Sequence, residues 1–276
     1  MSFKPTSRIG FGAMQLSRLH GDRAAAIAVL RRAEELGVDH VDTARFYGNG
    51  FADEVVREAL GGRVTVVTKV GAAPHPPQPW PKAAQRPAEL RAEVEANLTG
   101  LGVDRLDVVN LRRNDTGPGG PLERDQIVDV EDQLAELIAL RDEGKIGGIG
   151  LSSVSLDVLR RGLPAGIVCV QNAYSLANRS DEALLQLCVD EDIAWVPYFP
   201  LGSAFPGVPK VTDRPAVIAA AARLGATPAQ IGLAWLLHRA PNVLPIPGTA
   251  DVAHLEENMG AASITLDDET LRSLES

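Results

Sequence analysis

The sequence predicts a single domain with the α/β fold of a closed (β/α)8 TIM barrel, spanning residues 1–276. Three observations predict this fold class. Short β-branched runs alternate with longer helical patterns, as in βα units on a parallel sheet. Eight such runs occur, and a chain of 276 residues has room for eight units. No G-x-G-x-x-G motif follows the first run, so a doubly wound dinucleotide fold is the poorer interpretation. Two small domains are the second choice.

The predicted strands are short and apolar, and most are rich in Val and Ile. They cover residues 8–14, 38–42, 64–69, 106–111, 146–151, 167–171, 193–198 and 243–247. Amphipathic helices are expected between them, for example over residues 22–36 and 125–143. Polar capping residues should begin several helices, namely Asp22, Ser155, Ser180, Thr227 and Asp251. Residues 72–87 and 116–121, rich in proline or glycine, are expected to be long loops.

The composition excludes several functional classes. Lys and Arg number 27 against 36 Asp and Glu, a net charge of -9, so nucleic acid and anionic membranes are not expected partners. The chain has no apolar run of eighteen residues and no signal-peptide pattern, which favours a cytoplasmic location. Cys169 and Cys188 lie in apolar runs and are expected to be buried thiols. The five histidines form no H-x-H pair, so no metal site is predicted. The oligomeric state is not predicted.

Polar residues cluster where the predicted strands end. They are Gln15, Asp42, Thr43, Lys69, Arg112, Ser152, Ser153, Gln171, Asn172 and Tyr198. Barrel enzymes keep their active sites at this rim, so the cluster predicts an enzyme. Because Asp42 and Lys69 end adjacent strands, a carboxylate and an ammonium can meet at the barrel mouth. Tyr47 follows in a loop that can return to the same mouth.

Tyrosine, lysine and aspartate together suit proton delivery to a carbonyl oxygen. A phenol is too weak an acid at neutral pH, and an adjacent ammonium eases its ionisation. Asp42 would hold Lys69 charged and in place. An ordinary salt bridge between Asp42 and Lys69 at the rim is the alternative interpretation of that pair.

Five blocks along the whole chain resemble the aldo-keto reductases. These are VDTARFYG at 41–48, VVTK ending at Lys69, QNAYSLANR from Gln171, PYFPLGS from Pro197 and IPGTADVAHLEEN from Ile246. The resemblance implies a (β/α)8 barrel that binds a nicotinamide dinucleotide, usually NADPH, and reduces a small-molecule carbonyl substrate. It implies that Tyr47 is the general acid, Lys69 lowers the pKa of Tyr47 and Asp42 orients Lys69.

The resemblance also implies a set of cofactor contacts. Tyr198 would stack on the nicotinamide, Ser152 and Gln171 would hold its carboxamide, and Thr249 and His254 would lie near the 2'-phosphate. Gly248 and Thr249 also precede a helix that starts near Asp251, whose N-terminus suits an anion. The complete predicted set is Gly12, Met14, Ser152, Ser153, Gln171, Tyr198, Phe199, Pro200, Leu201, Gly202, Ser203, Ile246, Pro247, Gly248, Thr249, His254, Glu257 and Asn258.

The sequence departs from the family pattern at three of these places. Arg112 stands where the family has a histidine after its fourth strand, so both an oxyanion-binding role and a substrate-anchoring role stay open. Ser153 replaces a common asparagine. His254 replaces a common arginine, which weakens the preference for NADPH over NADH without reversing it. His40 shares a strand face with Asp42 and is expected to be an ordinary interior histidine.

The runs VDHVD, DVVNLR and IPGTADVAHLEEN look most like the bacterial pyridoxal reductases of this family. This likeness implies reduction of pyridoxal to pyridoxine, with Arg112 beside the phenolate oxygen of the ring. Two other functions remain open. One is an NADPH-binding sensor with poor turnover, which the missing histidine suggests. The other is a Schiff-base lyase or aldolase that uses Lys69.

Overall fold

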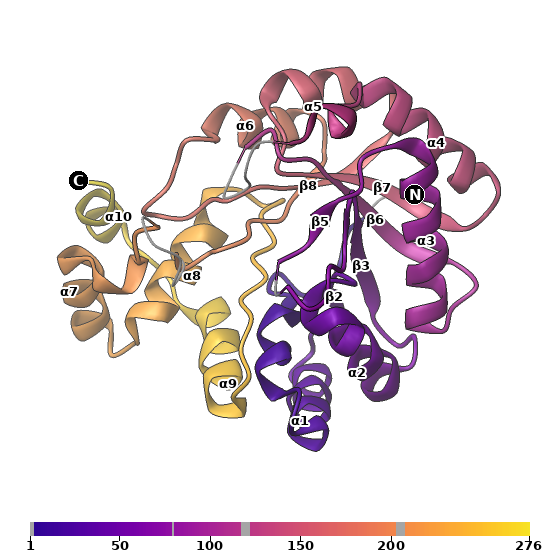
Figure 1. Cartoon of the computed structure of the whole chain (residues 1–276). Coiled ribbons are helices and arrows are strands. Elements are labelled where there is room, and N and C mark those ends of the chain that lie inside the picture. Colours follow the sequence, from indigo (N-terminus) through magenta and orange to yellow (C-terminus); the bar gives the residue numbers. More distant parts are fainter. Residues whose placement is uncertain (1–2, 79, 117–121, 203–207) are drawn as a thin grey trace.

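The sheet of this protein is parallel and follows chain order. The computed structural model describes residues 3–78, 80–116, 122–202 and 208–276. Its curved seven-stranded sheet has the order β1-β2-β3-β6-β7-β8-β9 (Figure 1). The strands are β1 Phe11–Gly12, β2 His40–Asp42, β3 Thr65–Val70, β6 Leu106–Arg112, β7 Ile146–Ser152, β8 Ile167–Gln171 and β9 Ala194–Trp195. Two further strands, β4 Ala72–Ala73 and β5 Lys82–Ala83, form an antiparallel hairpin.

Helices cover the outer face of this sheet (Figure 1). They are α1 Arg23–Glu35, α2 Phe51–Leu60, α3 Pro87–Leu101, α4 Val130–Asp142, α5 Leu156–Gly162, α6 Glu182–Asp190, α7 Pro215–Leu224, α8 Pro228–Arg239, α9 Val252–Gly260 and α10 Asp268–Glu275. Within the described residues, short 3-10 segments accompany them at Ala13–Leu19, Tyr47–Gly50, Arg124–Gln126, Leu163–Ala165, Val211–Asp213 and Ala261–Ser263. The predicted single α/β domain of the TIM-barrel class is confirmed.

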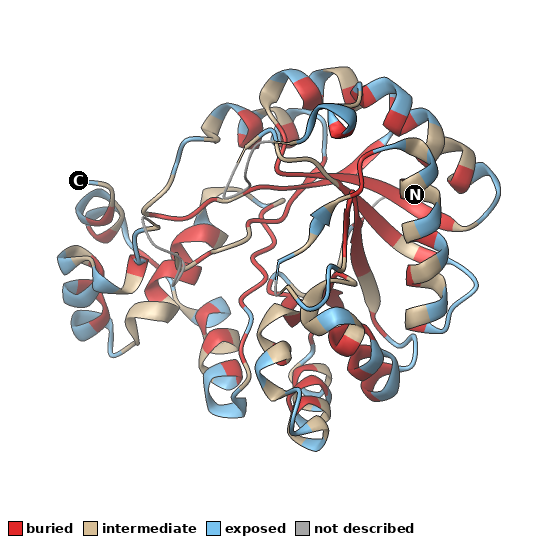
Figure 2. Cartoon of the chain, in the orientation of Figure 1, coloured by how far each residue is buried: buried red, intermediate tan, exposed pale blue. Residues whose placement is uncertain are grey.

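The core has two layers because successive strand residues face opposite sides of the sheet. Figure 2 shows the strands of the parallel sheet mostly buried, while the helices turn a buried face inward and an exposed face outward. Inside the barrel, Val67, Val108 and Val168 pack together with Cys169 and Val196. A larger cluster fills the space between the sheet and the helices. Both thiols are buried and free, as predicted.

Residues 242–247 close the barrel without forming a regular strand. The amide of Leu244 donates to Trp195 of β9, and the amides of Gly10 and Gly12 donate to Pro245 and Pro247. Because these two prolines have no N–H, the segment accepts hydrogen bonds from β1 but donates none back. The predicted eighth strand is therefore a half-bonded bridge between β9 and β1. An ion pair of 2.7 Å between Arg32 of α1 and Glu256 of α9 joins the same first and last units.

Other predicted boundaries need correction. The first strand is two residues long, because the chain turns into a 3-10 segment at Ala13, and β9 ends at Trp195. The helix expected over 125–143 begins only at Val130, where the Asp129 side chain caps it. Asp22, Ser155, Thr227 and Asp251 accept cap hydrogen bonds as predicted. Ser180 does not begin α6, since Asp181 occupies that position.

The loop expected over 72–87 contains the β4–β5 hairpin, whereas residues 117–121 of the other loop lie outside the described residues. No single helix among the described residues is long and apolar enough to cross a membrane. The bent pair α7 and α8 would be long and apolar enough by length and composition alone.

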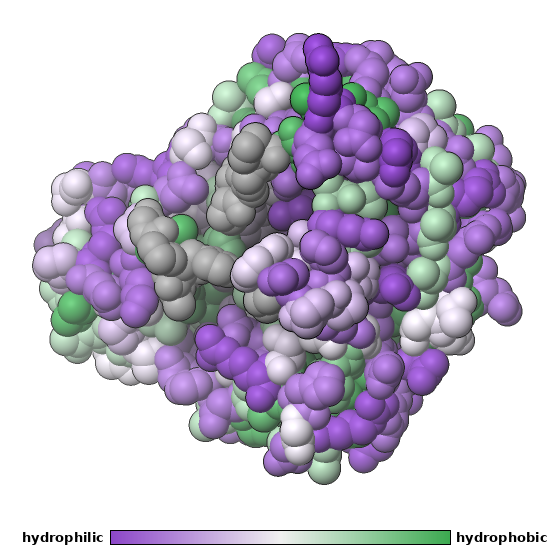
Figure 3. Space-filling model, in the orientation of Figure 1, coloured by the Kyte–Doolittle hydropathy of each residue, from purple (hydrophilic) through white to green (hydrophobic). Residues whose placement is uncertain are grey.

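The molecular face in Figure 3 is mostly hydrophilic, with scattered apolar side chains.

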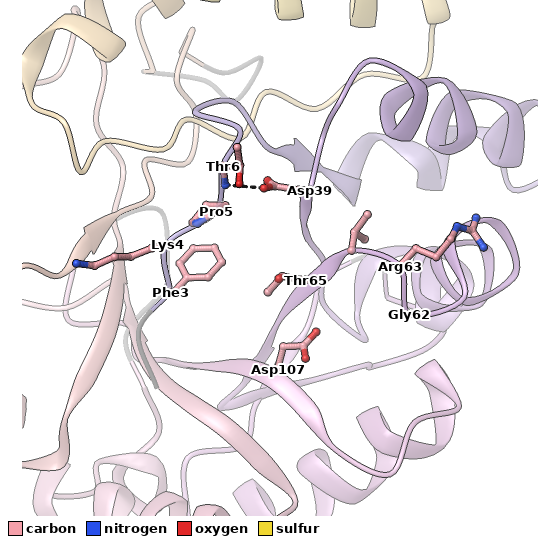
Figure 4. Close-up of a pocket in the computed structure, with 10 residues that line it drawn as sticks. Phe3, Lys4, Pro5, Thr6, Asp39, Gly62, Arg63, Thr65 and Asp107 are labelled. Carbon is pink, nitrogen blue, oxygen red and sulfur yellow. Dashed lines mark hydrogen bonds between the residues drawn. The ribbon is translucent and has the colours of Figure 1, made fainter.

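The opposite end of the barrel from the predicted site holds a cavity of about 400 Å³ (Figure 4). Its lining includes Phe3, Asp39, Thr65 and Asp107, at or near the amino ends of β2, β3 and β6. There Asp39 accepts from the amide of Thr6 at 2.6 Å. His40, also at this end, is buried, and its Nδ1 lies 3.0 Å from Asp39. His40 is thus a buried interior histidine, as predicted, two residues before Asp42 on β2.

Candidate active site

The carboxyl ends of β2, β3 and β8 bring Asp42, Lys69 and Gln171 into contact. Lys69 Nζ lies 2.6 Å from Asp42 Oδ1 and 2.8 Å from Oδ2, and it also donates to the carbonyl of Thr43 at 3.1 Å. Gln171 donates to Asp42 Oδ2 at 2.8 Å. All three side chains are buried. Lys69 is therefore fixed as a charged group by three oxygen acceptors, as charged groups in a protein interior require.

Tyr47 returns to this cluster through a sharp loop after β2. Gly48, Asn49 and Gly50 all adopt positive φ angles, of 61°, 53° and 99°. These left-handed residues, a conformation that glycine and asparagine adopt at low cost, lead from Tyr47 into α2. The turn that precedes them is closed by the Tyr47 amide, which donates to the Ala44 carbonyl at 2.8 Å. The Tyr47 ring then lies with its centroid 5.1 Å from Lys69 Nζ. The structure thus brings together the three side chains for which proton delivery was predicted.

The environment shifts the pKa values of these groups in a consistent way. Burial opposes the charge of Lys69, but Asp42 and Tyr47 outweigh it, so the pKa of Lys69 is raised. Burial raises the pKa of Tyr47, while the charges of Lys69 and Arg112 act in the opposite direction. At neutral pH, Lys69 is therefore an ammonium and Tyr47 carries its proton.

Arg112 ends β6 on the same rim, opposite Ser152 of β7. Its guanidinium carbon lies 5.8 Å from the centroid of the Phe46 ring. Burial lowers the pKa of Arg112, and its charge acts on both Tyr47 and Tyr198. An arginine stays cationic under such conditions, so the rim carries a second positive charge beside Lys69.

The residues predicted to hold a nicotinamide lie beside this cluster. Ser152 and Gln171 are buried and neighbours in the register of β7 and β8. The Gln171 amide donates to Asp42, but its buried Oε1 has no hydrogen-bond partner among the described residues. A carboxamide NH2 would satisfy this acceptor, so the site fits the predicted group. Ser153 has a φ of 57°, and its Oγ lies 3.2 Å from the Tyr198 hydroxyl.

The other residues predicted to contact the cofactor lie in the loop after β9 and at the carboxyl end of β1. Phe199 and Gly202 have positive φ angles of 53° and 85°, and Gly202 donates back to Phe199. Pro200 and Leu201 lie between them, and Ser203 lies outside the described residues. The backbones of Gly12 and Gly248 lie in close contact. A side chain at Gly248 could not fit there, since its Cβ would lie 2.4 Å from the Gly12 carbonyl oxygen. Met14, Ile246 and Pro247 flank this contact in sequence.

The predicted adenosine end is built around the N-terminus of α9. Asp251 caps the helix by accepting from the His254 amide at 2.9 Å, and the His254 side chain is exposed. Thr249 is buried and accepts from the Asp251 amide. Glu257 accepts from the Thr227 hydroxyl of α8, so part of its hydrogen-bonding capacity serves the packing of two helices. Asn258 is buried behind it.

One residue of this neighbourhood, Asp53 of α2, was not predicted from the sequence. It is buried and accepts from the Thr43 hydroxyl at 2.7 Å, and the Thr43 carbonyl in turn accepts from Lys69. Burial raises the pKa of Asp53. The signal was an acidic residue on the otherwise apolar face of a helix that directly follows the Tyr47 loop. No group of three His, Cys, Asp or Glu residues that would hold a metal ion exists among the described residues.

Comparisons with known proteins define the class to which this site belongs. The family model "Aldo/keto reductase family" matches residues 8–276, and the chain belongs to this family. The protein is therefore an oxidoreductase, and the family predicted from its sequence is confirmed. The chain is 43% identical over 281 residues to "Pyridoxine 4-dehydrogenase" of Escherichia coli K12, covering 99% of this chain and 95% of that protein.

Two solved structures of Klebsiella pneumoniae aldo/keto reductases share the fold. One, in complex with NADPH, is 28% identical and has a TM-score of 0.80, covering 99% of this chain and 94% of the other. The other, in complex with NADP and acetate, is 27% identical and has a TM-score of 0.79, covering 97% of this chain and 90% of the other.

Proposed function

We propose that this protein reduces an aldehyde with NADPH, that Tyr47 is the general acid and that pyridoxal is a substrate. One observation carries the proposal: Lys69, paired with both oxygens of Asp42, lies beside the Tyr47 ring at the barrel mouth. A phenol next to a fixed ammonium is suited to donate a proton to a carbonyl oxygen, since the ammonium stabilises the phenolate that remains.

The cofactor is NADPH, and it supplies a hydride to the carbonyl carbon when bound. Gln171 would accept a carboxamide N–H through its free Oε1, with Ser152 beside it and Tyr198 as the aromatic surface next to the ring. Thr249 and the N-terminal amides of α9 would face the phosphate of the adenosine end. Family membership and the two cofactor-bound structures support this assignment.

The chain itself moves one proton. Tyr47 donates it to the carbonyl oxygen as that oxygen gains negative charge, and Lys69 stabilises the phenolate. Asp42 keeps Lys69 charged and immobile. Gln171 holds Asp42 by donating to its Oδ2, and the Thr43 carbonyl accepts a further hydrogen bond from Lys69. A proton from water then restores Tyr47, so an aldehyde, NADPH and one proton give an alcohol and NADP+.

A Schiff-base mechanism at Lys69 is disfavoured by the same geometry. An imine-forming lysine needs a neutral amine with a free lone pair, which a lowered pKa provides. Lys69 instead donates to three oxygens, and its pKa is raised.

Two further features support the finer proposal. Similarity to the E. coli pyridoxine dehydrogenase supports a pyridoxal-type substrate, since a dehydrogenase and a reductase run one reaction in opposite directions. Aromatic side chains, Phe46 and Tyr47 on one loop and Tyr198 and Phe199 on another, offer surfaces for a planar ring. A reducing cytoplasm remains the expected compartment, in keeping with two free buried thiols.

The proposal is tested by following NADPH oxidation with pyridoxal, with 4-nitrobenzaldehyde and without substrate. Tyr47→Phe should lower kcat by about 100- to 10,000-fold with both aldehydes, because the phenolic proton is lost. NADPH binding, measured by fluorescence, should persist in this variant.

Tyr174→Phe is the matched control, since Tyr174 lies under α6 with its hydroxyl on Glu182 and should retain turnover. Wild-type rates in Tyr47→Phe would overturn the assigned role of Tyr47. Tight NADPH binding by the wild type without turnover of either aldehyde would instead favour a sensor.

A further inference from the structure

Arg112 is a part-buried cation without a counter-ion. It forms no ion pair and no side-chain hydrogen bond within the described part of the chain, where its guanidinium contacts the Phe46 ring. Every other described arginine that is not exposed donates to an oxygen, as the adjacent Arg113 does to Asp115 and Val128. The segments outside the described residues contain no Asp or Glu, so none of them supplies a carboxylate.

An unpaired guanidinium in this position costs free energy, because burial removes part of its hydration without supplying a negative charge. Burial accordingly lowers the pKa of Arg112. Such a cost is tolerated at functional sites where a ligand supplies the missing charge. The cost therefore points to a negatively charged group on a ligand.

The position of Arg112 defines where that charge would lie. Arg112 stands opposite Ser152 across β6 and β7, and its charge acts on the phenols of Tyr47 and Tyr198 alike. Its contact ring, Phe46, directly precedes Tyr47. Arg112 thus lies on the rim beside the loop that carries the proposed proton donor and beside Ser152, close to where the carbonyl would react.

We infer that Arg112 is a specificity-determining residue that selects aromatic aldehydes with an ionised hydroxyl on the ring carbon next to the one bearing the aldehyde. This inference rests on the proposed function and names its substrate class. The charge of Lys69 is already neutralised by Asp42, so Arg112 carries the unpaired positive charge at the barrel mouth. A single positive charge is balanced by a ligand group with one negative charge, whereas a phosphate dianion carries two. Phe46, Tyr47, Tyr198 and Phe199 favour an aromatic ring over an aliphatic chain.

Pairing with arginine also favours the reaction itself. An ionised ortho hydroxyl pushes electron density into the carbonyl and makes its carbon a poorer hydride acceptor. The guanidinium draws that density back, and its fork of N–H donors can serve the phenolate and the carbonyl oxygen together. Arginine does this at any working pH because it does not deprotonate.

The first test compares two isomeric substrates, 2-hydroxybenzaldehyde and 4-hydroxybenzaldehyde, at a pH where both phenols are ionised. We expect the wild type to favour the 2-isomer in kcat/KM and Arg112→Gln to lower that preference by about 10- to 100-fold, the value of a charge-assisted hydrogen bond. Arg124→Gln, which removes an exposed arginine, is the matched control and should keep the wild-type ratio. Phenylglyoxylate, which carries a carboxylate in place of the phenolate, is the third substrate. If Arg112→Gln lowered kcat/KM for phenylglyoxylate but for neither hydroxybenzaldehyde, the inference would be overturned.

The second test needs no turnover. In the complex with NADP+, the ionisation of bound 2-hydroxyacetophenone is titrated by its absorbance, with 4-hydroxyacetophenone as the control ligand. These ketones form imines with lysine less readily than aldehydes do. The phenol pKa of the 2-isomer should fall by about one unit or more in the wild type and not in Arg112→Gln.

The outcomes separate the two proposals. A lowered phenol pKa in the wild type, with no reduction of any aldehyde, would support the role of Arg112 and overturn the proposed function. Turnover with the same isomer ratio in wild type and Arg112→Gln, and no pKa shift, would overturn the role of Arg112 alone.

Discussion

At the scale of single residues, the charge state of Lys69 depends on its neighbours, and on Asp42 more than on Tyr47. Asp42 offers both oxygens to Lys69 Nζ in a buried setting, where burial by itself lowers the pKa of Lys69 and disfavours its charge. The ammonium is present at neutral pH because Asp42 and Tyr47 together outweigh the lost hydration and raise the pKa of Lys69. The proposed acidity of Tyr47 therefore rests on a carboxylate that does not touch the substrate.

Asp42→Asn tests this dependence through the pH profile of kcat. Without the carboxylate, burial dominates and the pKa of Lys69 falls, so the ammonium is lost at lower pH than in the wild type. We expect kcat at pH 7 to drop by about 10- to 100-fold and the alkaline limb of the profile to move down by about one to three pH units.

Asp267→Asn serves as the control, because it removes a carboxylate from the cap of α10, and its profile should match the wild type. An Asp42→Asn variant with a lower kcat but an unmoved alkaline limb would show that Asp42 positions groups without setting the charge of Lys69.

At the scale of elements, helix starts connect the barrel to the candidate cofactor site. Thr227 caps α8 by accepting from the Gln230 amide, and its hydroxyl donates to Glu257 of α9. Gln230 also donates to the Glu257 carbonyl at 2.9 Å. The N-terminus of α8 is thereby fixed to the helix whose own N-terminus forms the predicted adenosine end.

Replacing Thr227 by alanine removes both the cap and the link to α9. We expect a loss of about 1 to 2 kcal/mol in the free energy of unfolding, measured by urea denaturation, because the cap hydrogen bond and a partner of Glu257 are lost together. Ser155→Ala, which removes the cap of α5 alone, should cost about 1 kcal/mol. Thr227→Ser keeps both contacts and should restore stability. An equal loss in Thr227→Ala and Thr227→Ser would contradict this account.

At the scale of the whole molecule, stability depends on a seam between the first and last units. Residues 243–247 accept from β1 and donate to β9, and Gly10 lies in this seam with its amide on Pro245. The His40 ring packs directly against Gly10, where a Cβ would lie 2.3 Å from His40 Nε2. Only a residue without a side chain permits this approach of strand and ring.

Gly10→Ala should therefore destabilise the barrel by about 1 to 3 kcal/mol, since the buried His40 cannot move aside without disturbing its packing. Gly21→Ala is the matched control, because a Cβ at Gly21 meets nothing within 4 Å. Thermal unfolding monitored by circular dichroism should show a lower Tm for the first variant and little change for the second. Equal Tm values would mean that the seam adapts to an added methyl group.

The fold class and the ring of polar residues could be predicted from the amino-acid sequence alone. Hydrophobic periodicity and strand order are local properties, and in a parallel barrel every strand end reaches the same rim, so Asp42, Lys69, Arg112 and Gln171 were predictable there. Helix boundaries were less predictable where short turns compete with caps, as at Ser180 and Asp181.

Which rim residues bond to one another could not be predicted, because those contacts form only when distant parts of the chain fold together. Asp42 and Gln171, 129 positions apart, meet because barrel curvature brings β2 and β8 together across the mouth. Arg112 has no carboxylate partner among the described residues, and its guanidinium contacts the ring of Phe46, 66 positions earlier in the sequence. Asp53 joined the site through Thr43, and prolines at 245 and 247 left the last strand half-bonded. Charge pairing and burial depend on distances between remote residues, which a sequence pattern does not contain.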